Sequence, residues 1–196
     1  MTTKYIKMLS QHDFEYSYYL QTRLFKTYKK IVEDIINQKF EGKLLDIGCG
    51  DNAFVKVCND NKLEAVGIDY DQVNLEEDNF PFQNRFFNFV TANAVIEHLF
   101  KPHKMLEEVG RVLKVGGLFL LTTPNWNRCY KNFYRDPLHV HPYNPESISI
   151  LMKMFGFKTM FLEPKLILRS NFWWKIPFKW HLPLGTKSMF CIAKKL

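Results

Sequence analysis

Apolar residues recur at three- and four-residue steps near the start of the chain, with charged residues between them. This spacing extends from Tyr16 to Phe40 and predicts an amphipathic helix. Short apolar runs typical of strands follow: KLLDIGCG, EAVGID, FNFVTANAV, LFLLTT, GFKTMFLE and TKSMFCIAKK. Helical patterns separate them at 52–58, at 102–114 and in PESISILMKMF. Alternating strands and helices predict parallel pairing through right-handed crossovers, and hence an α/β, doubly wound sheet.

The length of 196 residues suits one well-buried core. We expect a single domain over 1–196, with a helical cap over 1–40, a core over 41–164 and a tail over 165–196 that includes the final strand. The four cysteines are scattered and lack the paired spacing of a metal site. No apolar run approaches the roughly 20 residues of a membrane span. These features predict a cytoplasmic protein that binds no metal.

A glycine-rich turn, DIGCGDN at residues 46–52, follows the first strong strand pattern. Its glycines allow a tight turn and a close approach of the backbone to a ligand. Asp69 ends the next strand about 20 residues later, a spacing at which a carboxylate meets the two hydroxyls of a ribose. Because ligands bind at the carboxyl ends of parallel strands, these residues together predict a nucleoside site.

Asp46, at the head of this turn, distinguishes two nucleoside ligands. A nicotinamide dinucleotide would bring its phosphates to the turn, where a carboxylate repels them. S-adenosylmethionine instead carries an ammonium and a sulfonium, which a carboxylate attracts. The turn also lacks a third glycine, and both features favour S-adenosylmethionine.

Four segments resemble, in order, the motifs of class I S-adenosylmethionine-dependent methyltransferases: LLDIGCGDN, AVGIDYD, FPFQNRFFNFVTANAVIEHL and LKVGGLFLLTTPN. The resemblance covers about residues 40–164. The EHL tripeptide and HPYNPESI followed by GF are similar to the small-molecule branch that includes the ubiquinone-biosynthesis O-methyltransferases. The resemblance implies a seven-stranded, mostly parallel sheet with the last strand, around 188–193, antiparallel. It also implies methyl transfer to a small or lipid-like acceptor, at oxygen before nitrogen or carbon.

The resemblance further implies which residues hold the cofactor. Asp46 and the backbone of Gly48 and Gly50 would hold the methionine part, and Asp69 the ribose. The other cofactor-binding candidates are Tyr70, Asn74 and Leu75 around the adenine, Asn93 and Ala94 near the methionyl group, and Cys49 and Asn52 in the turn.

Three asparagines and one cysteine need comment. Asn52 stands where many members of the family have glycine, and asparagine tolerates left-handed backbone better than most residues. Asn74 and Asn88 stand where relatives often have aspartate. We expect Cys49 to pack within the turn and not to act as a nucleophile, because no base is marked for it.

Methyl transfer from a sulfonium requires proximity, orientation and, for a hydroxyl acceptor, a base. The candidate bases are His139 and His141, in the loop that overhangs the cofactor in this family. The alternative is that these two histidines only tie down the loop. We expect His98, at a helix start, to cap or pack.

The net charge of +7 resides in the last 33 residues, because all 20 acidic residues lie at or before Glu163. Three of the four tryptophans share this tail. Aromatic and basic side chains together suit peripheral membrane contact, through residues 165–185, or nucleic-acid binding. The alternative is an insertion whose tryptophans enter the core.

Two other functions stay open. The basic tail permits a tRNA or other RNA methyltransferase. Asn74 and Asn88 favour a non-catalytic methyltransferase-like protein that regulates a partner.

Overall fold

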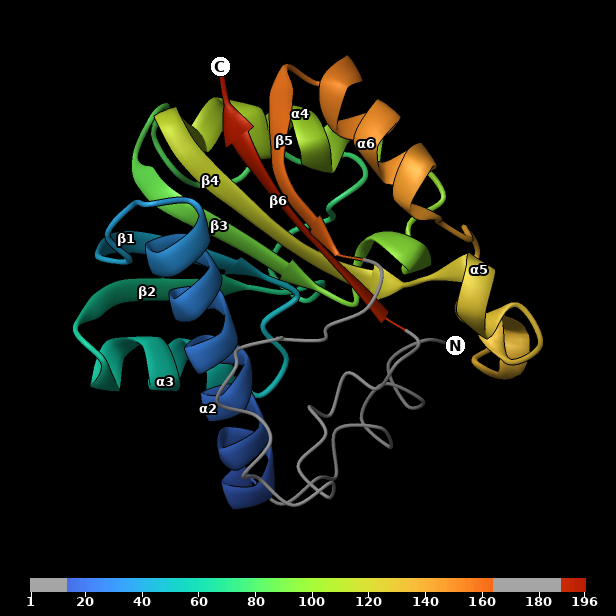
Figure 1. Ribbon diagram of the computed structural model, residues 1–196, viewed down its shortest axis with the longest axis horizontal. Coiled ribbons are helices and arrows are strands. Elements are labelled where there is room, and N and C mark those ends of the chain that lie inside the picture. Colours follow the sequence, from blue (N-terminus) through green and yellow to red (C-terminus); the bar gives the residue numbers. More distant parts are fainter. Residues whose placement is uncertain (1–13, 164–187) are drawn as a thin grey trace.

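The computed structural model describes residues 14–163 and 188–196. These residues form a six-stranded sheet with helices over both faces (Figure 1). The strands are β1 (Gly42–Ile47), β2 (Leu63–Ile68), β3 (Phe87–Asn93), β4 (Leu113–Pro124), β5 (Phe157–Glu163) and β6 (Ser188–Lys195). The helices are α2 (Phe14–Lys30), α3 (Ala53–Asp60), α4 (His103–Val112), α5 (Trp126–Cys129) and α6 (Pro145–Met154). Short helical turns are η1 (Ile31–Ile35), η2 (Ile96–His98) and η3 (Phe133–Arg135).

The strand order is β2-β1-β3-β4-β6-β5. β1 pairs in parallel with β2 and β3, and β3 pairs in parallel with β4. β6 runs antiparallel to both of its neighbours, β4 and β5. The predicted doubly wound sheet and its antiparallel last strand are therefore confirmed. The parallel strands bring their carboxyl ends to one edge of the sheet, beyond which α5 lies (Figure 1).

The predicted number of strands, seven, is wrong for the part of the chain that the structure describes, which has six. The seventh strand was implied by the family resemblance, whereas the apolar runs themselves number six. The stretch from β2 to β3 is held by side chains of α4 and forms turns. Arg111 donates to the carbonyls of Phe80 and Phe82, at 2.9 and 2.7 Å, and the Phe80 amide donates to Glu108. The Phe80 amide and the carbonyls of Phe80 and Phe82 therefore bond to side chains of α4 and not to a neighbouring strand.

Two apolar clusters cover the two faces of the sheet. On one face α4 and α6 pack over side chains such as Leu45, Val90 and Phe119. On the other face α2 and α3 pack over the alternate residues, such as Leu44 and Phe89. Strands covered on both sides read as continuous apolar runs, which explains why the sequence pattern identified them.

The predicted helix over 16–40 is confirmed in type but is shorter. α2 begins at Phe14 and continues as a π-helical turn, η1, that ends at Ile35. Asn37 then adopts a left-handed φ of 58°, which directs the chain out of the helix.

The basic aromatic segment predicted over 165–185 lies outside the described residues, so its membrane, nucleic-acid and core interpretations stay predictions. In residues 14–163 and 188–196, every helix is too short or too polar to span a lipid bilayer.

Candidate functional site

A sharp turn, the glycine elbow (residues 48–52), joins β1 to α3. At Gly48 φ is +70°, and a Cβ built there would lie 2.5 Å from Cγ2 of Val95, so a larger residue would clash. The amides of Gly48 and Cys49 donate to the carbonyl of Ile68, at 2.9 and 3.3 Å. These bonds hold the elbow against the carboxyl end of β2.

The far side of the elbow is open. A Cβ at Gly50, where φ is +53°, would meet no atom within 4 Å in the described part of the chain. Asn52 adopts the left-handed conformation predicted for it, with φ 62° and ψ 15°. The Asp51 side chain accepts a hydrogen bond from the amide of Ala53, the first residue of α3, at 3.0 Å. A ligand can therefore approach the elbow backbone at Gly50 without a side chain in its path.

Asp69 follows β2 and faces the elbow. Its Oδ2 accepts a hydrogen bond from the Gly50 amide at 2.6 Å, and its Oδ1 accepts one from the Tyr70 amide at 2.7 Å. A carboxylate has about four lone-pair positions, so each oxygen keeps one for a further donor. This half-buried carboxylate is thus fixed by the backbone and still able to accept from ribose hydroxyls.

Asp46 lies near the end of β1 and is buried. Its Oδ1 accepts a hydrogen bond from the Thr91 hydroxyl at 2.6 Å and a longer one from the Asn93 amide at 3.5 Å. Burial raises the pKa of Asp46 to about 7, and the nearby negative charge of Asp69 adds to the rise, while the bonds from Thr91 and Asn93 oppose it. The two acids therefore place negative charge at the ends of β1 and β2, a region that we call the crevice, and a cationic ligand would offset that charge.

Sequence reasoning missed a polar connection between this crevice and α2. The hydroxyl of the fully buried Tyr28 donates to Oδ1 of Asn93 at 2.5 Å, and the Thr122 hydroxyl donates to the same atom at 3.4 Å. The helical pattern from Tyr16 to Phe40 places Tyr28 only on an apolar helix face. Its phenol was the available signal, because a buried tyrosine hydroxyl needs a partner.

The other candidates occupy varied environments. Tyr70 is 46% exposed beside Asp69. Asn74 is exposed, and its Oδ1 accepts a bond from the Glu76 amide at 3.1 Å, which stabilises its own turn. The side chain of Leu75 belongs to the core, so only its backbone can face a ligand. Ala94 has a φ of 54°, unusual for a residue with a side chain, and follows Asn93 at the end of β3.

Cys49 is buried in the elbow, and burial raises the pKa of its thiol to about 12. It remains protonated at neutral pH. This agrees with the packing role predicted for it.

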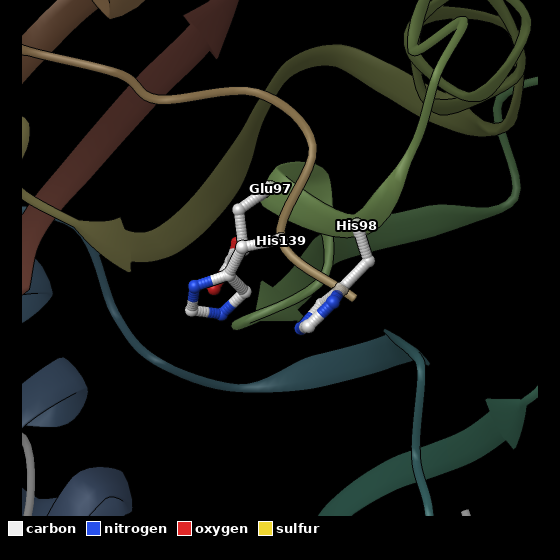
Figure 2. A group of neighbouring side chains, drawn as sticks. All are labelled: Glu97, His98 and His139. Atoms are coloured by element: carbon white, nitrogen blue, oxygen red, sulfur yellow. The ribbon is translucent and has the colours of Figure 1, made fainter. Parts of the chain in front are cut away.

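A second group of polar side chains lies beyond β3 and β4 (Figure 2). Glu97 and His98 come from η2, and His139 comes from the loop after η3. One possible ligand atom from each lies within 4.8 Å of the other two. We call this group the carboxylate–histidine cluster. His141, the second candidate base, is not part of it: it is exposed, with Nε2 3.1 Å from the Phe100 carbonyl oxygen.

Burial governs the chemistry of this cluster. It raises the pKa of Glu97 to about 7, and the hydrogen bond from Thr123 opposes the rise. It also lowers the pKa of His98. The expectation that His98 packs is consistent with its place against His139, with ring centroids 4.7 Å apart.

Residues 16–160 match the family model of the methyltransferase domain. The chain belongs to this methyltransferase family. A probable S-adenosylmethionine-dependent methyltransferase of Mycolicibacterium smegmatis is 26% identical over an alignment 153 residues long, and the match covers 68% of this chain and 59% of the relative. A demethylmenaquinone methyltransferase of Staphylococcus saprophyticus is 26% identical over an alignment 137 residues long, which covers 56% of this chain and 59% of the relative. The chain thus spans less than two thirds of the length of either relative.

Solved structures show the same fold. An S-adenosylmethionine-dependent methyltransferase from Archaeoglobus fulgidus superposes with a TM-score of 0.62 at 22% identity, covering 87% of this chain and 94% of that one. The PH0226 protein of Pyrococcus horikoshii gives 0.61 at 16% identity, covering 88% and 91%. The family and fold predicted from the motifs are confirmed, and the finer likeness to ubiquinone-biosynthesis O-methyltransferases stays a prediction.

Proposed function

We propose that the chain is an S-adenosylmethionine-dependent methyltransferase that acts at oxygen on a small or lipid-like acceptor. The observation that carries this proposal is the pair of acids, Asp46 and Asp69, beside the glycine elbow in a chain of the methyltransferase family. A carboxylate with a raised pKa next to a second carboxylate favours a ligand with positive charge.

The ligand's groups match the crevice in order. Asp69 would accept hydrogen bonds from the ribose hydroxyls, and Asp46 would face the ammonium and sulfonium. The sulfonium supplies a methyl group that is already activated. The protein's remaining tasks are to orient the acceptor and to exclude water, and the buried polar contacts of Asn93 with Tyr28 and Thr122 support that region of the pocket.

The acceptor belongs at the neighbouring strand ends, beside the carboxylate–histidine cluster. Of the two candidate bases, His139 is favoured by its environment. Its Nδ1 lies 2.8 Å from the Phe133 carbonyl oxygen, which can only accept, so Nδ1 carries the proton and Nε2 keeps a lone pair. That lone pair suits a base toward an acceptor hydroxyl. His141 is solvent-exposed and supports the loop.

The acceptor class has its own support. One curated relative is named for methyl transfer to demethylmenaquinone, which favours a small or lipid-like molecule over a nucleic acid. The basic aromatic tail is compatible with membrane-associated acceptors, by peripheral contact through residues 165–185.

One argument against the non-catalytic alternative concerns Asn88. It lies at the amino end of β3, where its Oδ1 accepts bonds from the Lys43 amide at 3.2 Å and from Lys114 Nζ at 2.9 Å. That end of the strand is opposite the crevice. The replacement of aspartate at this position therefore affects strand ends and not the ligand pocket.

Calorimetry with S-adenosylmethionine tests the proposal. The native chain should bind it, and Asp69→Asn should weaken binding about 10–100-fold, because two charge-assisted hydrogen bonds are lost. Asp71→Asn is the matched control: it removes an exposed acid two residues away and should leave the affinity unchanged. Absence of binding by the native chain would overturn the proposal.

The base assignment needs a turnover measurement with an accepted substrate. His139→Ala should lower kcat about 100-fold, whereas His141→Ala should leave kcat within about twofold. If both variants keep full turnover, neither histidine is the base.

A further inference from the structure

The carboxylate–histidine cluster contains a buried acid, one oxygen of which has no partner in the part of the chain that the structure describes. The Glu97 side chain is fully buried. Its Oε2 accepts a hydrogen bond from the Thr123 hydroxyl at 2.9 Å, but its Oε1 has no partner within the described residues. A buried carboxylate oxygen without a donor is costly, so this atom requires either a proton or a cation.

Both histidines of the cluster are oriented through the same ring atom. Nδ1 of His98 lies 3.2 Å from the Leu138 carbonyl oxygen, and Nδ1 of His139 lies 2.8 Å from that of Phe133. Because a carbonyl can only accept, each Nδ1 carries the proton and each Nε2 keeps its lone pair. A backbone carbonyl on one ring nitrogen is the usual support of a histidine whose other nitrogen binds a metal.

The backbone holds the two halves of the cluster together. The amides of Val140 and His141 both donate to the carbonyl oxygen of Glu97, at 2.8 and 3.1 Å. The loop carrying His139 is therefore bound directly to η2, which carries the other two side chains. The cluster is organised before any ligand arrives, which lowers the entropy cost of binding.

A nearby acid adds negative charge. Oδ2 of Asp136 lies 3.9 Å from Nε2 of His139, too far for a hydrogen bond, and its charge contributes to the raised pKa of Glu97. Among the described residues, two acids and two histidines thus lie in one region.

We propose that Glu97, His98 and His139 bind a divalent transition-metal ion, with Zn²⁺ the best match. Two imidazoles and one carboxylate form a ligand set that Zn²⁺ accepts in four-coordinate sites with one open position. Ligand atoms around tetrahedral Zn²⁺ lie about 3.3 Å apart. The candidate ligand atoms lie within 4.8 Å of one another, so they must approach by up to about 1.5 Å to share one ion.

This inference runs against the absence of metal expected from the sequence, which rested on cysteine spacing. It stands on coordination geometry and not on the proposed methyl transfer. If the chain transfers methyl groups as proposed, a bound ion would occupy the lone pair of His139 and would itself lower the pKa of an acceptor hydroxyl in place of that histidine.

The test uses tag-free chain, treated with a chelator and then titrated with Zn²⁺ and with Co²⁺. One Zn²⁺ should bind per chain with a dissociation constant below about 1 μM, and Co²⁺ should give the visible absorption of a four-coordinate site. A strong thiolate-to-cobalt charge-transfer band would instead locate the metal on cysteine and overturn the assignment.

Variants complete the test. Glu97→Gln preserves side-chain shape and removes the charge, and it should weaken Zn²⁺ binding at least about 100-fold, as should His139→Gln. The control is His103→Gln, an exposed histidine on α4, which should bind as the native chain does. Equal affinity in Glu97→Gln and the native chain, or no binding to the native chain, would refute the site. S-adenosylmethionine binding measured on the same variants is a separate readout that tests the proposed function alone.

Discussion

Two neighbouring regions at the same edge of the sheet differ in the hydrogen bonds that their carboxylates receive. In the crevice at the ends of β1 and β2, Asp46 accepts from Thr91 and Asn93, and Asp69 accepts from two backbone amides. In the carboxylate–histidine cluster beyond β3 and β4, Glu97 has one hydroxyl partner and one oxygen without any among the described residues.

The difference shows how each region is prepared for its ligand. In the crevice, both acids already receive hydrogen bonds without a ligand. A cationic ligand would therefore offset only the free-energy cost of burying Asp46 next to Asp69. In the cluster, Oε1 of Glu97 has no hydrogen-bond partner among the described residues, which is why we infer an ion there. Four predictions test this contrast, from the largest expected effect to the smallest.

The largest effect is expected at Asp46. Its pKa is about 7 in the folded chain against 3.8 for the unperturbed group, so the folded state binds this proton more tightly than the unfolded state does. The resulting stability is complete below about pH 4 and is lost as the pH rises to about 7, an amount of about 4 kcal/mol. Asp46→Asn should remove this slope from the free energy of unfolding, measured by urea denaturation of ligand-free protein at several pH values.

The control is Asp71→Asn, which replaces an exposed acid. It should keep the native dependence of the free energy of unfolding on pH. Parallel pH profiles for the native chain and Asp46→Asn would mean that this carboxylate does not titrate as described.

A matched pair of threonines compares the two regions directly. Thr123→Val should destabilise the chain by about 2 kcal/mol, because it leaves both oxygens of Glu97 unpaired. Thr91→Val should cost about 1 kcal/mol, because Asp46 keeps the Asn93 amide. Chemical denaturation of metal-free protein measures both. The reverse ranking would contradict the contrast between crevice and cluster.

Tyr28→Phe tests the connection from α2 to the crevice. Loss of the hydroxyl bond to Asn93 should cost about 1 kcal/mol and weaken S-adenosylmethionine binding about threefold. Tyr18→Phe, on the same helix, loses an exposed bond to Asp60 and should leave the affinity unchanged. Thermal unfolding measures the stability, and calorimetry measures the affinity for S-adenosylmethionine. Equal affinities for both variants would show that Tyr28 does not contribute to binding.

The smallest effect is expected at Asn52. Asn52→Gly should stabilise the chain by about 0.5 kcal/mol, because glycine adopts the left-handed backbone conformation of this position without strain. Asn61→Gly is the contrasting control, because φ at Asn61 is −105° and glycine gains nothing from it. A loss of stability in both variants would show that the Asn52 backbone carries no strain.

The sequence predicted most of the fold and the crevice because their signals are local. Six apolar runs mark six strands, and the turn from Asp46 to Asn52 is one continuous segment whose glycine and asparagine conformations follow from residue type. The prediction of a seventh strand was wrong because it came from the family resemblance, and no apolar run in the sequence corresponds to that strand. The polar role of Tyr28 was missed because hydrophobic periodicity shows only that a helix face is apolar. It does not show that a tyrosine on that face has a hydroxyl with a polar partner.

By itself, the sequence determined the doubly wound α/β sheet, the order of its motifs and the two acids at adjacent strand ends, since each depends on residues close together in the chain. Tertiary structure alone decided that Glu97 and His98 meet His139, that His141 stays outside, and that one oxygen of Glu97 is buried with no partner in residues 14–163 and 188–196. The physical reason is that burial and pairing depend on segments distant in sequence, which only the packing of β3, β4 and the following loop brings together.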